Sequence, residues 1–239
     1  MSNTEEDLPP EPPTAERVAA RALVLSAISC RGSIEKDAHK SGAEDLRKQV
    51  VAWLDSLGLF EEVETVELEL LSTPLGQLES KKAKDAGWKS EGLVVLAWAL
   101  GCTNLPPGHD QCDPPAIADT LGFLCERSET PLENPSLRSS EEIEKWADVY
   151  LTLHWRLRQQ LHHPGPMDFV KFVSDCQWAA LRLDSLEIVD KDLAINGIPM
   201  NKVDHQIFRG CLSITQERHQ AFNWLLGFER LYSQVTTDT

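Results

Sequence analysis

The chain has 239 residues, of which 41% are hydrophobic and 26% are charged. This composition supplies material for one sizeable core and excludes a wholly disordered chain. The 38 acidic side chains outnumber the 23 basic ones and give a formal charge of −15. Because such a chain repels phosphate backbones and anionic lipids, we expect no nucleic-acid partner. The basic run at Lys81, Lys82 and Lys84 is interpreted as a solvated surface segment.

Membrane insertion and export are not expected from the sequence. The best apolar candidate, Ala22 to Cys30, has about nine residues, whereas a bilayer span needs about 18. Acidic residues precede it, while a secretory signal begins with positive charge. The six cysteines are scattered through a chain too long to need disulfide staples. We therefore expect a cytoplasmic protein.

The sequence pattern of the first part of the chain predicts a flexible tail followed by helices. Residues 1–13 are rich in proline and acidic residues and are expected to form a flexible tail. A helix is predicted from a cap at Thr14 to Gly32, and another over Leu46–Leu57. Residues 64–71 alternate like a strand, but their neighbours also allow a short helix, which we favour.

The middle of the chain contains its most apolar segment. The run from Ser90 to Gly101 is apolar on every side, which is typical of a central buried helix. The prolines of Cys102–Pro115 predict a loop, and a short helix is expected over 117–124. Residues 127–137 are interpreted as a further loop.

The clearest helix signal lies after this loop. Ser139 and Glu142 form a capping-box pattern, and the apolar stripe that follows ends before Pro164. A further helix is predicted over Phe169–Leu183. Because a short turn joins the two helices, we expect them to pack antiparallel.

The sequence pattern of the last part of the chain predicts a small β element and a final helix. Asn196-Gly197 between β-forming residues is a strong hairpin signal. Ser213 and Gln216 form a second capping-box pattern, which places the start of the last helix near residue 213.

Together these elements predict a mainly α (α+β) fold. We expect a single-domain helical bundle of about seven to eight helices over residues 14–239, with a small β-hairpin near residues 186–200. The apolar segment Leu93–Leu100 is expected to be the centre around which the other helices gather.

Several segments resemble one known family. They are WKSEGLVVLAWALG at Trp88–Gly101, the segment Trp146–Arg158, the hairpin DLAINGIP, ERHQAFNWLLG at Glu217–Gly227, and the terminal TTDT. In order and spacing they resemble the bacterial family known as domain of unknown function 4272, from about Thr14 to Thr239. The resemblance implies a bacterial, cytoplasmic, stand-alone domain and supplies no activity or catalytic residue.

Metal and cofactor motifs are missing from the sequence. It contains no Cys-x-x-Cys, no His-Glu-x-x-His and none of the glycine-rich phosphate-binding patterns. We therefore expect no cofactor and no metal. His154 lies on the apolar stripe of the helix that follows Ser139, where it is either a ligand or base or, in the simpler interpretation, a hydrogen-bonded core residue.

Two clusters are the best candidates for a binding site. Glu217, Arg218 and His219 lie in the first turns of the predicted last helix, where only one or two of them can face a pocket. In the other interpretation, Glu217 and Arg218 join Asp238 or another helix in a charge-assisted hydrogen-bond network. Glu91 either caps the central helix between core tryptophans or is the polar group of a tryptophan-walled pocket. The candidate binding residues are Trp88, Glu91, His154, Arg218, His219, Trp224 and Asp238.

Two functions remain open at this point. The first is a non-catalytic module that binds a protein or ligand, in which the acidic surface engages a basic protein partner. The alternative is an enzyme, a metal-assisted hydrolase in which His154, His219, Glu91 and Asp238 meet in one pocket. Oligomeric state is not predicted.

Overall fold

The computed structural model describes residues 11–125 and 133–238, and within them the protein is mainly helical, as predicted. The eight α-helices of this part are α1 (Ala15–Ile34), α2 (Ala43–Ser56), α3 (Thr65–Ser72), α4 (Ser80–Ala99), α5 (Pro114–Thr120), α6 (Ser140–His162), α7 (Phe169–Asp175) and α8 (His205–Leu225). Three short strands, β1 (Ile188–Val189), β2 (Asp192–Ile195) and β3 (Ile198–Pro199), form a sheet. No helix among the described residues is long and apolar enough to cross a membrane.

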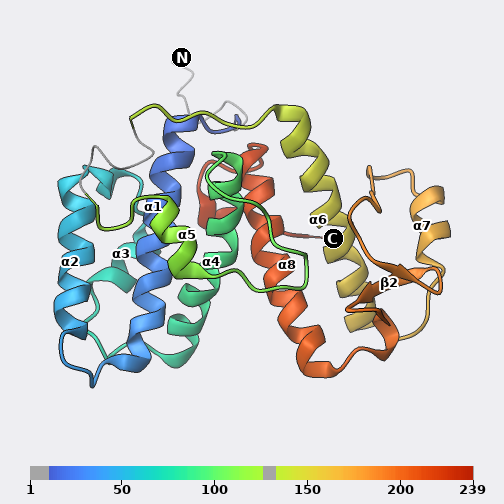
Figure 1. Cartoon of the computed structure of the whole chain (residues 1–239), viewed down its shortest axis with the longest axis horizontal. Helices are drawn as coiled ribbons and strands as arrows, with labels where there is room; N and C mark the ends of the chain where they lie inside the picture. Colours follow the sequence, from blue (N-terminus) through green and yellow to red (C-terminus); the bar gives the residue numbers. More distant parts are fainter. Residues whose placement is uncertain (1–10, 126–132, 239) are drawn as a thin grey trace, which may run out of the picture.

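Helix α4 is the centre of the molecule, as the apolar run predicted. Every side chain from Leu93 to Leu100 is at most 9% exposed. α4 packs against α1 on one side and α8 on the other, and α6 packs on α8 (Figure 1). Burial of each large aliphatic side chain of this run contributes about 1.5–3 kcal/mol to the stability of the core.

Helix α4 begins ten residues earlier than the predicted start at Ser90, because its bounds are Ser80 and Ala99. The added turns contain alanine and lysine, which are good helix formers, and no proline. The lysines at 81, 82 and 84 are exposed on these turns, as expected for a solvated segment.

The N-terminal helices follow the sequence signals closely. Thr14 caps α1 by accepting a hydrogen bond from the Arg17 amide. Residues 65–72 are helical, as we favoured, because Glu64 and Glu67 form a reciprocal capping box at the start of α3. The predicted tail over 1–13 lies largely outside the described residues. Of residues 11–13, which the structure does describe, Pro13 is buried.

Helix α7 ends at Asp175, so the predicted helix to Leu183 is wrong in its second half. The Arg182 amide donates to the Thr152 hydroxyl of α6 at 2.7 Å, a bond that replaces the intrahelical one. α7 itself lies against β2 and reaches α6 through Phe172, which stacks on Trp155 with ring centroids 4.1 Å apart.

The predicted hairpin is present, and a third strand extends it. β2 pairs antiparallel with β3 and with β1, in the order β1-β2-β3. Asn196 and Gly197 connect β2 to β3 with φ angles of 53° and 76°. Positive φ at both central positions is the requirement of a tight hairpin turn that asparagine and glycine meet most easily.

The last helix begins earlier than predicted. Asp204 caps α8 by accepting hydrogen bonds from the Gln206 and Ile207 amides. Ser213 and Gln216 therefore lie inside the helix, and the predicted start near residue 213 is wrong. As a consequence, Arg218 and its neighbours lie in the second half of α8 rather than in its first turns.

Candidate functional site

Arg218 and Glu91 form a fully buried ion pair between α8 and α4. Both side chains are 0% exposed, and the Arg218 Nε and Nη2 atoms donate to Glu91 Oε2 at 2.9 and 2.7 Å. The prediction that Glu91 lies near the N-terminus of its helix is wrong, since α4 starts at Ser80. Glu91 balances the Arg218 charge instead of capping a helix.

The remaining donors of Arg218 hold the loop between α4 and α5. Nη1 donates to the carbonyls of Pro106 and Pro107 at 3.1 and 3.0 Å, and Nη2 donates to the carbonyl of Asp110 at 2.7 Å. Glu91 Oε1 accepts the Cys112 amide of the same loop at 3.0 Å. Because the guanidinium is thereby saturated, Arg218 positions the loop and has no donor left for a ligand.

His154 of α6 and His219 of α8 contact each other in the core. Their Nδ1 atoms are 3.0 Å apart, and the side chains are 1% and 2% exposed. Burial lowers the pKa of His154 to about 3 and the pKa of His219 to about 4. Both rings are therefore neutral at pH 7, and one Nδ1–H donates to the other Nδ1. This pair joins two helices of the core.

The other predicted binding residues do not join these two pairs. Trp224 is fully buried, and its ring packs at an angle on Tyr232 with centroids 5.7 Å apart. Trp88 is half-buried on α4. Asp238 is exposed and forms no hydrogen bond or ion pair with another described residue.

The C-terminal segment is tied down by residues other than Arg218 and Glu217. Asn223 Nδ2 donates to the Thr236 carbonyl at 3.0 Å, and Gln220 Nε2 donates to the Tyr232 carbonyl at 2.8 Å. Glu217 pairs with Lys89 of α4 at 2.8 Å. Glu217 and Arg218 therefore form charged contacts with another helix, α4, as one form of the prediction has it, and the alternative contact with Asp238 is wrong.

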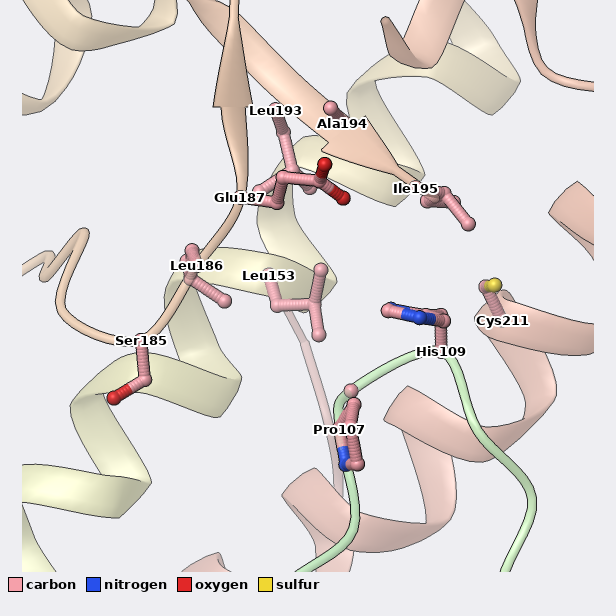
Figure 2. A pocket seen from close by; sticks show the side chains of 11 residues that line it. Pro107, His109, Leu153, Ser185, Leu186, Glu187, Leu193, Ala194, Ile195 and Cys211 are labelled. Atoms are coloured by element: carbon pink, nitrogen blue, oxygen red, sulfur yellow. The ribbon is translucent and has the colours of Figure 1, made fainter. Parts of the chain in front are cut away.

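The clamped loop presents His109 to a narrow cleft. The cleft has a volume of about 70 Å³, and its walls come from the loop, α6, α8, strand β2 and the segment that leads into the sheet. Figure 2 shows the His109 imidazole extending across it between Leu153 and Cys211, while the Ser185 hydroxyl points away from the other lining side chains. The lining residues are Pro107, Gly108, His109, Leu153, Ser185, Leu186, Glu187, Leu193, Ala194, Ile195 and Cys211.

The cleft combines apolar walls with one carboxylate. Glu187 is exposed, and its backbone is held at the cleft because its carbonyl accepts the Ala194 amide at 2.8 Å. Cys211 is buried, and burial raises the pKa of its thiol to about 11, with the nearby Asp110 carboxylate adding to the shift. Since the thiolate is the nucleophilic form of cysteine, Cys211 is a neutral wall residue at pH 7.

His109 and Glu187 are not among the candidate binding residues that the sequence predicts. The signal that could have found His109 is its position directly after Pro106-Pro107-Gly108, because prolines stiffen a loop and so fix the residue they present. No local signal indicates Glu187, since its place depends on pairing within the sheet.

The residues proposed for metal-assisted chemistry are divided between separate contacts. His154 faces His219, while Glu91 faces Arg218. Among the residues that the structure describes, no group of three or more histidine, cysteine, aspartate or glutamate side chains is placed to hold a metal ion.

The fold and the cleft define a mainly helical protein in which a clamped loop between α4 and α5 forms one wall of a narrow cleft. Residues 3–169 match the family described as Domain of unknown function (DUF4272). This match covers more than half of the chain, so the protein belongs to that family. The match begins before Thr14 and ends before Glu217–Gly227 and the terminal TTDT, where the resemblance was also seen. No curated protein and no solved structure matches the chain.

Proposed function

We propose that the protein is a non-catalytic binding module that captures a lysine or arginine side chain of a basic partner protein in the His109 cleft. The observation that carries the proposal is the position of Glu187 beside a mainly apolar cleft of about 70 Å³ whose lining includes no lysine or arginine. Lysine and arginine have aliphatic stems that bury against apolar surface and a cationic end that remains near solvent. The apolar walls of the cleft can cover the aliphatic stem, and the Glu187 carboxylate can pair with the cationic end.

Charge and size both support this kind of ligand. None of the lining residues is lysine or arginine, and the whole chain carries a formal charge of −15. A negative surface draws a basic protein towards it and speeds encounter. A cleft of this volume suits one side chain better than a drug-sized molecule, whose pockets are typically about 300–1,000 Å³.

The chemistry of the polar groups supports binding rather than catalysis. The raised pKa of Cys211, about 11, leaves its thiol protonated, and the donors of Arg218 are all used within the protein. The alternative of a metal-assisted hydrolase has no comparable support, because His154, Glu91 and Asp238 are not gathered in one site. We further propose that the setting is the bacterial cytoplasm, in keeping with the family resemblance and the scattered cysteines.

A random-peptide phage library provides the test. We expect peptides selected on the wild-type protein to share a lysine or arginine and to bind Glu187→Gln at least about tenfold more weakly. Glu144→Gln is the matched control, since Glu144 is exposed near the start of α6 and its loss changes the net charge equally. Failure to select any peptide, or selected peptides that bind both variants equally, would reject the proposal.

A further inference from the structure

A second cavity lies between α1 and α5, apart from the His109 cleft. It has a volume of about 290 Å³, and Leu93 of the central helix forms part of its wall. α5 packs against both α1 and α4 (Figure 1). Residues of α1 and α5 line most of the cavity. Its volume is far above the roughly 10–15 Å³ that one water molecule needs.

One wall of the cavity is a row of serines on α1. Ser26, Ser29 and Ser33 follow each other at spacings of three and four residues, which places them on one face of the helix. The Ser26 hydroxyl donates to the Ala22 carbonyl at 3.0 Å. The hydroxyl of Ser29, by contrast, has no hydrogen-bond partner among the described residues, although the side chain is only 2% exposed.

An unpaired buried hydroxyl is a cost to the fold. Burying such a group without a hydrogen bond destabilises a protein by about 1–3 kcal/mol, so unpaired hydroxyls are uncommon in cores. Here the hydroxyl belongs to a residue that lines a cavity, where a bound molecule can supply the missing partner. The position of Ser29 therefore points to a ligand.

The other walls define what that ligand is. Pro114, Pro115 and Phe123 provide rigid apolar surface opposite the serines. Burial raises the pKa of the neighbouring Cys30 thiol, which keeps it uncharged, and the one acidic lining residue, Asp119, is exposed at the edge. None of these lining residues is a buried charged group that could pair with an ionic ligand.

We propose that the cavity between α1 and α5 binds a small neutral molecule with an apolar ring and one carbonyl or hydroxyl group, which hydrogen-bonds to Ser29. This site is independent of the proposed function, because it shares no lining residue with the His109 cleft. A neutral donor or acceptor suffices, since serine can both donate and accept.

The test compares two probes of similar shape by isothermal titration calorimetry. Acetophenone carries a carbonyl, whereas ethylbenzene lacks one. We expect wild-type protein to bind acetophenone roughly tenfold more tightly, the equivalent of one hydrogen bond. In Ser29→Ala the two probes should bind equally. Ser72→Ala is the matched control and should keep the preference, because Ser72 lies on α3 outside this cavity and its hydroxyl donates to the Glu69 carbonyl of its own helix.

A filling variant checks the location. Ala118→Phe places a ring in the cavity from α5 and should abolish binding of both probes while circular dichroism shows an intact helical fold. The proposal is overturned if neither probe binds the wild-type protein, if Ser29→Ala keeps the preference for acetophenone, or if folded Ala118→Phe binds as the wild type does.

Discussion

The buried histidine pair predicts a specific dependence of stability on pH. In the folded protein the pKa values of His154 and His219 are lowered by burial to about 3 and about 4, whereas the ordinary value is 6.5. At pH values between about 4 and 6.5, the two histidines bind protons in the unfolded chain and not in the folded chain. The stabilising contribution is therefore fully present above pH 6.5 and is lost as pH falls towards 4.

The magnitude follows from these pKa values. Between pH 7.5 and 5.5, each histidine is expected to lower the free energy of unfolding by about 1.4 kcal/mol, and the pair by about 2.7 kcal/mol. His154→Asn removes one of the two and should reduce the pH-dependent loss by about 1.4 kcal/mol. Comparing each variant with itself at the two pH values cancels any constant loss of packing.

Urea unfolding followed by tryptophan fluorescence, at constant ionic strength, measures this difference. His162→Asn is the control, because His162 is exposed at the end of α6 and its removal leaves the buried pair intact. The reasoning is refuted if His154→Asn and His162→Asn lose the same free energy of unfolding between pH 7.5 and 5.5.

Two further predictions concern the core. Arg218→Lys keeps the charge but loses the forked donors, so we expect about 2–4 kcal/mol lower stability and faster amide exchange at Cys112, measured by urea unfolding and hydrogen exchange. A Cβ at Gly92 would lie 2.1 Å from the Tyr232 hydroxyl oxygen, so Gly92→Ala should cost about 1–3 kcal/mol. That oxygen has no hydrogen-bond partner among the residues that the structure describes, so Tyr232→Phe should be neutral or stabilising and should rescue part of the Gly92→Ala loss in a double-mutant cycle; strictly additive effects would contradict this.

The fold was largely predictable because its signals are local. The unbroken apolar run at Leu93–Leu100 identified the central helix, and Asn196-Gly197 identified the hairpin through the positive φ angles that such a turn needs. The errors came where two local signals competed. Ser213 matches a capping pattern, but Asp204 already caps the helix and nothing between them interrupts it.

The candidate site was less predictable because it is built from distant contacts. Arg218 and Glu91 were both named as candidates, yet nothing in the sequence indicates that they pair across 127 positions and saturate each other. Pairing also hides their role, since two charged residues in apolar segments suggest a ligand site until the structure shows that they clamp a loop. Glu187 carries no local pattern that sets it apart from surface residues, and the local signal for His109 is limited to the preceding Pro106-Pro107-Gly108.

The central claim, that the His109 cleft takes a basic side chain, is tested most directly by titrating isotope-labelled protein with Nα-acetyl-lysine methylamide and recording amide chemical shifts. We predict shifts at Gly108, His109, Ala194 and Ile195, and much smaller ones with the uncharged norleucine analogue. Equal shifts with both compounds, or shifts confined to other parts of the molecule, would contradict the account.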